Sequence, residues 1–185
     1  MAASILDVRA SAALLARVLA TLNSADRPAF TAALGNLFEH SPWVADETWP
    51  RRPFRDAIHL HAELCRTMQA APPDRRLALI RAHPDLAGRL ARQHQLTPES
   101  AREQSSAGLN RLSDAEFAEF QRLNDAYRVK FGFPFVICAR LNAKDTILAA
   151  MRARLPNEPA TEQAAALAEI EKIAWLRLQD LVKEG

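Results

Sequence analysis

Residues 113–132 read SDAEFAEFQRLNDAYRVKFG, and this stretch contains both ends of a helix and its apolar face. Ser113, followed three residues later by Glu116, forms a capping box, in which each side chain accepts a hydrogen bond from the other residue's backbone amide. Gly132 is typical of the position just beyond a helix. Large apolar side chains recur between them at helical spacing: Phe117, Phe120, Leu123, Tyr127 and Phe131. The stretch therefore predicts one long amphipathic helix.

The same spacing recurs along most of the chain, whereas the alternation typical of strands is almost absent. Further helices are expected over residues 5–22, 26–40, 58–70, 74–81, 98–107, 144–155 and from 160 onward. Trp43 to Pro53, rich in Trp and Pro, is interpreted as a short irregular connection. Phe133 to Ala139 is a continuous apolar run that should cross the interior in extended form. We expect an all-α, bundle-like fold of about eight helices with one buried extended segment near 133–139.

Composition places the chain among ordinary globular proteins. Of its 185 residues, 49% are hydrophobic and 25% are charged, and neither an internal repeat nor a linker is evident. We therefore expect one domain over residues 1–185. The net charge of +2 is small and the basic residues are scattered among acidic ones, so the sequence does not favour a nucleic-acid binder. Cys65 and Cys138 are interpreted as buried thiols in a reducing compartment.

No membrane segment or secretion signal is expected. Residues 1–20 carry Asp7, Arg9 and Arg17 within their apolar stretch, which is not typical of a secretory signal. No run approaches the roughly 20 apolar residues that span a bilayer. We expect a cytoplasmic protein, and the N-terminal helix and Trp43–Pro53 are candidates for a homodimer contact.

Several common catalytic motifs are missing from the sequence. It contains no HExxH, no glycine-rich phosphate loop and no GxSxG elbow, so metalloenzymes, NTPases and α/β hydrolases are poorly supported. His59 and His61 are two residues apart, and on a helix they point to different sides and cannot share one ion. No metal site is predicted.

His83 lies between two expected helices and directly before Pro84. Proline disfavours helical geometry at the preceding residue, so the ring of His83 could point into a cavity. The alternative is that it caps the carbonyl groups at the end of the helix over residues 74–81, where the helix dipole favours a cation. The local sequence leaves both interpretations open.

The expected helix over residues 98–107 has no large apolar side chain, so it cannot be held mainly by an apolar stripe. Ser100, Glu103, Gln104 and Ala107 fall at positions i, i+3, i+4 and i+7, on one face. This face presents a hydroxyl, a carboxylate and an amide together. The alternative is an ordinary solvated surface helix.

Arg140 follows directly on the apolar run from Phe133 to Ala139. A permanently charged guanidinium at the end of a buried segment needs an anionic partner, because its desolvation would otherwise be too costly. That partner could be a structural carboxylate or an anionic ligand.

In their order and spacing, several uncommon strings resemble the family of 2-oxo-4-hydroxy-4-carboxy-5-ureidoimidazoline (OHCU) decarboxylases. They include SPWVA at 41–45, HPDLAG at 83–88, LTPES at 96–100, EQ at 103–104, AGL at 107–109, FGFPF at 131–135 and Arg140. The strings EIEKIA at 169–174 and LRL at 176–178 are also similar. The resemblance covers about residues 22 to 182, and residues 1–20 carry least of it.

The resemblance implies an all-α fold, no cofactor, and decarboxylation of an anionic ureidoimidazoline to (S)-allantoin in urate degradation. It also implies that His83 and Glu103 are catalytic. The implied substrate-binding residues are Pro84, Ser100, Gln104, Phe135, Ile137 and Arg140, with backbone groups of the Phe135–Arg140 segment also in contact with the substrate. Two alternatives are a non-enzymatic helical interaction module and a lyase or hydrolase acting on another ureide.

Overall fold

The computed structural model describes residues 16–88 and 95–184, with side chains up to residue 181. Within these ranges the chain forms nine α-helices and no strand, which confirms the all-α prediction. None of the helices described is long and apolar enough to cross a membrane. The chain forms two compact units, one of residues 73–173 and the other of residues 1–72 with 174–185. The sequence shows no linker at these borders, and the single domain stays a prediction.

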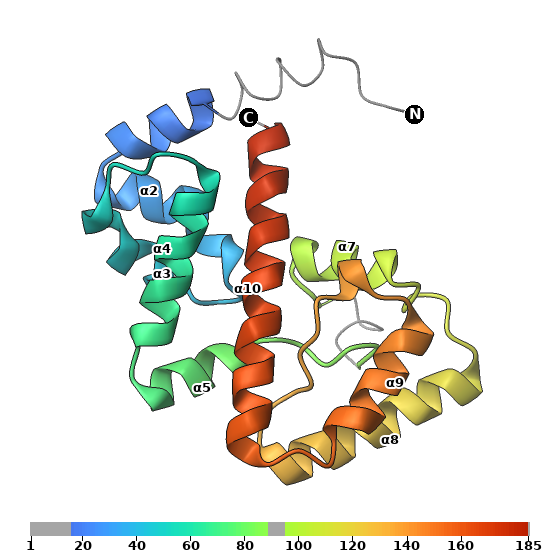
Figure 1. Ribbon diagram of the computed structural model, residues 1–185. Coiled ribbons are helices and arrows are strands. Elements are labelled where there is room, and N and C mark those ends of the chain that lie inside the picture. The colour runs from blue at the N-terminus through green and yellow to red at the C-terminus, as the bar shows by residue number, and fades with distance from the viewer. Residues whose placement is uncertain (1–15, 89–94, 185) are drawn as a thin grey trace. The chain divides into compact units, whose positions relative to one another are not determined.

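The unit that contains the N-terminal part is built from short helices (Figure 1). These are residues 16–24, α2 (Arg27–Leu34), the 3-10 turn η1 (Gly35–Leu37), α3 (Trp43–Thr48), η2 (Trp49–Arg51) and α4 (Ala57–Ala70). The first predicted helix is observed from residue 16 onward, and its earlier part lies outside the described residues. Asp26 caps α2 by accepting a hydrogen bond from the Ala29 amide at 2.9 Å.

The prediction of an irregular connection from Trp43 to Pro53 was wrong, because most of it is helical. Two prolines occupy places that helices tolerate: Pro42, directly before the segment, precedes the first helical residue of α3, and Pro50 lies in the first turn of η2. The Trp49 indole donates to the carbonyl of Ala25 at 3.1 Å, which fixes this end of the segment. Aromatic and proline content therefore did not indicate an absence of helix here.

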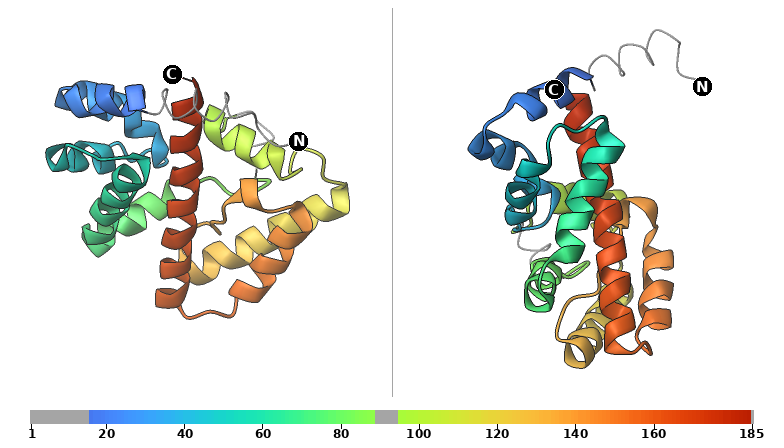
Figure 2. Two further views of the ribbon diagram at one scale, coloured as in Figure 1. Left: turned by 45° about the horizontal axis from the view of Figure 1, so that its top comes forward. Right: turned by 60° about the vertical axis from the view of Figure 1, so that its left-hand side comes forward.

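The second unit contains α5 (Pro73–Arg81), α7 (Pro98–Ser106), α8 (Asp114–Phe131), η3 (Ala139–Leu141), α9 (Lys144–Arg154) and the first part of α10 (Pro159–Glu184). The capping box is confirmed: Glu116 N lies 3.3 Å from Ser113 Oγ, and Ser113 N lies 2.8 Å from Glu116 Oε2. Gly132 ends α8 with φ 72°, which favours glycine. Helices α8 and α9 lie side by side (Figures 1 and 2).

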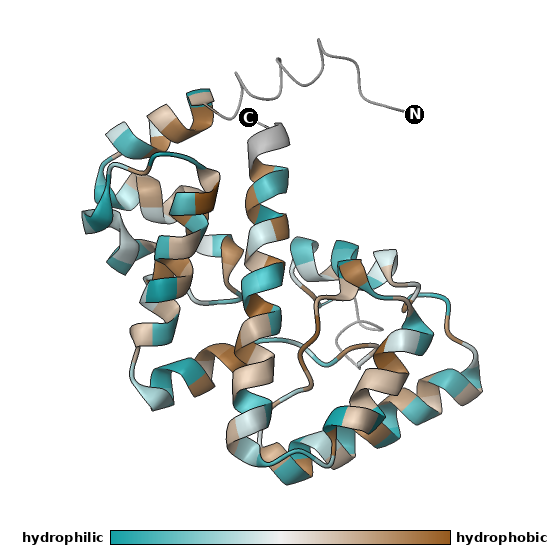
Figure 3. Ribbon diagram, viewed as in Figure 1, coloured by the Kyte–Doolittle hydropathy of each residue, from teal (hydrophilic) through white to brown (hydrophobic). Residues whose placement is uncertain are grey.

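The segment from Phe133 to Ala139 is buried throughout, as predicted, and forms no strand. Figure 3 shows most of the connection that leads from α8 to α9 in brown, the colour of hydrophobic residues. The rings of Phe133 and Phe135 pack edge-on against Tyr127 of α8, with centroids 6.2 and 5.2 Å apart. At Ala139 the chain turns into η3 and returns to the surface. This segment brings apolar side chains next to the polar face of α7.

Candidate active site

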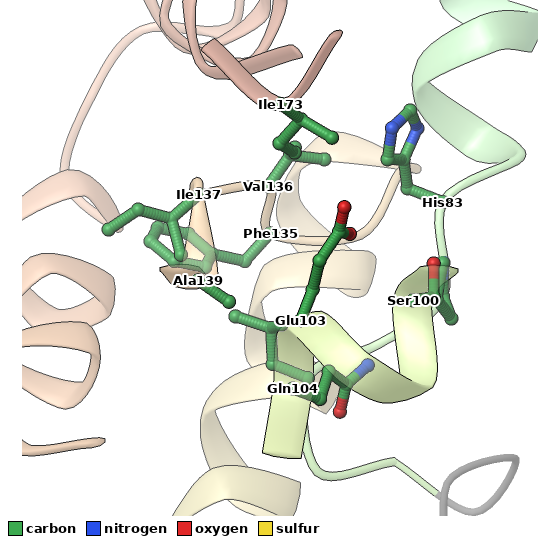
Figure 4. A pocket seen from close by; sticks show the side chains of 11 residues that line it. His83, Ser100, Glu103, Gln104, Phe135, Val136, Ile137, Ala139 and Ile173 are labelled. Carbon is green, nitrogen blue, oxygen red and sulfur yellow. The ribbon is translucent and has the colours of Figure 1, made fainter. Parts of the chain in front are cut away.

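A hollow of about 360 Å³, partly open to solvent, lies within the unit of residues 73–173 (Figure 4). That volume includes space open to solvent, and the enclosed part measures about 30 Å³. Its lining consists of His83, Pro84, Leu86, Ser100, Glu103, Gln104, Phe135, Val136, Ile137, Ala139 and Ile173. Seven of the eight site residues predicted from the sequence are in this set; the exception is Arg140.

His83 follows the end of α5 and is buried. Its Nδ1 lies 3.0 Å from the carbonyl oxygen of Leu79 in the last turn of that helix. Because a carbonyl can only accept a hydrogen bond, Nδ1 is the protonated nitrogen, and Nε2 is the atom that can gain or lose a proton. The ring thus caps the helix and lines the hollow at once, so the two interpretations of His83 are both correct.

Helix α7 presents its polar face to the interior. Thr97 caps the helix, with its Oγ1 3.3 Å from the Ser100 amide, and Pro98 is in the first turn. Ser100, Glu103 and Gln104 are buried, with exposed fractions of 4%, 9% and 5%. The alternative of a solvated surface helix is therefore wrong. Buried polar side chains of this kind require hydrogen-bond partners, which the protein or a ligand can supply.

The carboxylate of Glu103 points to the same side of the hollow as the His83 ring (Figure 4). The charge of Glu103 also acts on the Cys138 thiol, which belongs to the extended segment over residues 133–139. Burial raises the pKa of the Cys138 thiol, and the carboxylates of Glu169 and Glu103 raise it further. The hollow therefore combines an imidazole, a carboxylate and apolar walls formed by the extended segment.

Gln104 directs its amide away from Glu103, toward the segment that follows His83 (Figure 4). Its Oε1 accepts from the Ala87 amide at 2.9 Å and its Nε2 donates to the carbonyl of Asp85 at 3.2 Å. Ala87 has φ 52°, a conformation that is costly for a residue with a Cβ. Such strain persists only where neighbouring contacts impose it, and Gln121 adds one by donating to the Ala87 carbonyl.

Arg140 is exposed and does not line the hollow. It lies in η3, beside a separate, open depression that Arg111 and Lys144 also line. Arg140 does follow a buried run, but the chain turns at Ala139 and leaves its side chain exposed, so the expectation that its guanidinium is desolvated was wrong. Its contact with a substrate stays a prediction.

Four apolar lining residues were not predicted as site residues: Leu86, Val136, Ala139 and Ile173. Val136 lies between the predicted Phe135 and Ile137, and Ile173 follows the inward-facing Ile170 by three residues in α10. Helical spacing could therefore have indicated that Ile173 faces inward, but not toward which hollow. The residues that the structure describes contain no group of three His, Cys, Asp or Glu placed to hold a metal ion.

Comparisons with known proteins point to one family. A profile of the OHCU decarboxylase family matches residues 23–179. The chain is 44% identical to a 2-oxo-4-hydroxy-4-carboxy-5-ureidoimidazoline decarboxylase from Halalkalicoccus jeotgali, over 86% of this chain and 89% of that one. It is 43% identical to the protein of the same description from Amia calva, over 88% of this chain and 93% of that one.

Two solved structures have a similar fold. An (S)-allantoin synthase matches 88% of this chain with a TM-score of 0.68 and 31% identity, and the chain spans about half of that protein, 53%. An OHCU decarboxylase solved in the presence of (S)-allantoin matches 86% of this chain with a TM-score of 0.66. At 24% identity, the second likeness shows the fold alone.

Proposed function

The chain belongs to the OHCU decarboxylase family, and we propose that it converts OHCU to (S)-allantoin in the hollow that His83 and Glu103 line. As a member of this family it is a carboxy-lyase of urate degradation that acts on a small molecule. The observation that carries the proposal is the meeting of a helix-anchored imidazole and a buried carboxylate in one small hollow.

The reaction places two demands on the site. When CO2 leaves, the bond between the carboxylate carbon and the ring carbon breaks, and its electron pair remains with the heterocycle, which can delocalise it. A proton must then reach that ring carbon from one face to give a single stereoisomer. The protein has to bind and orient the anion, stabilise the charge that develops on the ring, and deliver a proton.

His83 transfers the proton. The hydrogen bond from its Nδ1 to Leu79 fixes the ring and the tautomer, so only Nε2 exchanges a proton with the substrate. Imidazole can take up and release a proton, and it is the side chain that most often does so in enzyme sites. Fixing the ring in advance reduces the entropy lost in reaching the transition state.

Glu103 orients the imidazole or a substrate proton from α7, and Ser100 on the same face hydrogen-bonds the substrate. Gln104 pairs with the ureido arm through the hydrogen-bonding capacity that its contacts to Asp85 and Ala87 leave. As the family resemblance implies, Arg140 contacts the anionic substrate, and Arg140→Ala tests this role. A raised KM supports the contact, and an unchanged KM removes Arg140 from the site.

The direct test is an assay with OHCU generated freshly from urate, since the compound is unstable. We expect CO2 release and (S)-allantoin formation, followed by circular dichroism, to run well above the spontaneous rate. A folded protein that leaves the spontaneous rate unchanged would exclude the activity and favour the interaction module. Turnover of another ureide in preference to OHCU would favour a different lyase or hydrolase on this scaffold.

Two further properties are part of the proposal because only the sequence supports them. We propose that the protein is cytoplasmic and that it forms a homodimer, with Trp43–Pro53 and the N-terminal helix as the contact. Sedimentation at micromolar concentration tests the second: a single species with the mass of one chain, 20.5 kDa, would contradict it.

A further inference from the structure

The wall of the hollow opposite α7 is formed by an extended segment. Its backbone groups are not hydrogen-bonded within a helix or a sheet. Residues 133–139 are buried and extended, yet the described chain contains no strand that could pair with them. Buried backbone N–H and C=O groups that find no hydrogen-bond partner cost free energy comparable to a lost hydrogen bond. The partners of this segment therefore have to come from elsewhere in the unit.

Two charged side chains supply such partners. Arg154 Nη1 of α9 donates to the carbonyl of Val136 at 2.9 Å, and Glu169 Oε2 of α10 accepts from the Cys138 amide at 2.8 Å. Groups on residues two apart point to the same side of an extended chain. The N–H and C=O of Ile137, between them, consequently point to the other side. Holding Val136 and Cys138 thus fixes the direction of the Ile137 backbone groups.

Arg154 is itself held from three directions. Its guanidinium centre lies 4.5 Å from the ring centroid of Phe135, and its Nε donates to Glu162 Oε1 at 3.0 Å. A second, closer hydrogen bond joins Arg154 Nη2 to Glu162. Glu162 is fully buried and also accepts from Asn157 at 2.9 Å. A planar, doubly bonded guanidinium of this kind has little freedom to move.

Stability alone does not account for this arrangement. Burial raises the pKa of the Glu162 carboxyl to about 7 and lowers that of Arg154, which shows that burial disfavours both charges. Buried ion pairs often add no stability compared with apolar side chains of similar volume. The ion pair does fix the positions of Phe135 and Val136, which both line the hollow. Apolar side chains in its place could not supply that fixed geometry.

We propose that Arg154 and Glu169 are positioning residues: they hold the backbone of Phe135–Cys138 so that Ile137 presents its backbone groups to the bound substrate. The inference rests on the proposed function, since the family resemblance already implies substrate contact by backbone groups of this segment; the positioning role of Arg154 and Glu169 is what the structure adds. Neither side chain is in the lining, so each acts through the segment it holds. Displacing a positioned group by about 1 Å can cost on the order of 10²-fold in rate.

The test compares Glu169→Leu, which removes the acceptor for Cys138 N–H, with Glu169→Gln, whose Oε1 can still accept it. We expect Glu169→Leu to lower kcat/KM by 10- to 100-fold and Glu169→Gln to stay within about 3-fold of wild type. Arg154→Met combined with Glu162→Gln should resemble Glu169→Leu. The matched control is Arg152→Met, which breaks an exposed ion pair to Glu119 from the same helix and should leave kcat/KM unchanged.

A readout without turnover separates this proposal from the proposed function. In Glu169→Leu, but not in Glu169→Gln, the Cys138 amide should exchange with solvent at least 10-fold faster, and (S)-allantoin should bind at least 10-fold more weakly than to wild type. Faster exchange with unchanged allantoin affinity and kcat/KM would overturn the positioning role. A wild-type protein that binds allantoin without decarboxylating OHCU would contradict the proposed function alone.

Discussion

The Nδ1 atom of His83 lies 3.0 Å from the carbonyl oxygen of Leu79, four residues earlier in the last turn of α5. This hydrogen bond gives the imidazole one fixed orientation and leaves Nε2 as the nitrogen that can exchange a proton. A residue that caps a helix is usually a structural one. Here the capping hydrogen bond orients a side chain that is proposed to react, since the ring of His83 also lines the hollow.

Replacing His83 by Asn separates the two roles of the ring. The Asn amide can still donate to Leu79 O from near the place of Nδ1, but it cannot exchange a proton as Nε2 does. We expect kcat to fall by about 10²-fold or more, the usual scale of acid–base catalysis, with little change in thermal stability. Turnover of OHCU and thermal unfolding measure the two effects. Near-normal kcat in the folded variant would remove His83 from the mechanism.

Replacing Glu103 by Gln keeps the shape of the side chain and removes its charge. If the carboxylate orients a proton in the reaction, kcat should fall at least about 10-fold while (S)-allantoin still binds. Steady-state kinetics and calorimetric titration with allantoin give both values. An unchanged kcat with weakened allantoin binding would make Glu103 a binding group only.

Replacing Gln104 by Ala removes the acceptor for the buried Ala87 amide and the donor to Asp85. We expect a loss of about 1–3 kcal/mol in the free energy of unfolding, because a buried N–H is left without its acceptor. KM should rise more than kcat falls, since the walls beside His83 loosen and a substrate contact is lost. Urea unfolding and kinetics measure both.

The control for Gln104 is Gln121→Ala, which removes a hydrogen bond to the same Ala87 from outside the hollow. It should cost stability with less effect on KM. If kcat collapsed in Gln104→Ala while KM stayed constant, its assignment as a binding group would be wrong.

Replacing Ser113 by Ala tests the element that the sequence defines most completely. The variant loses the capping hydrogen bond to the Glu116 amide at the start of α8. We expect a loss of about 1 kcal/mol of stability in urea unfolding and unchanged kcat/KM. Thr161→Ala, at an exposed position of α10, is a suitable control and should change stability by less than about 0.5 kcal/mol. Equal stability of the Ser113 variant and wild type would show that the cap contributes nothing.

Features set by neighbouring residues were predictable from the sequence. The cap at Ser113, the stop at Gly132 and the cap at Thr97 depend on side chains within one helical turn, and all three are observed where the sequence indicates. The helices within Trp43–Pro53 were not predicted, because a segment rich in Trp and Pro suggests irregular structure. Proline at the start of a helix is nevertheless compatible with it.

Features that depend on distant segments meeting were only partly predictable. The family resemblance indicated His83 and Glu103, and helical spacing placed Glu103 beside Ser100 and Gln104. No local pattern reveals that Ile173 of α10 closes the same hollow, or that η3 turns Arg140 outward. Those facts follow from tertiary packing, which periodicity in one segment does not record.

The central claim is that the hollow beside His83 and Glu103 is where OHCU loses CO2. A crystal structure of the protein with (S)-allantoin bound tests it most directly. We predict that the product lies in that hollow, with a ring or ureido atom within hydrogen-bond distance, about 3 Å, of His83 Nε2. Allantoin bound only in the depression beside Arg140, or elsewhere with the hollow empty, would contradict the claim.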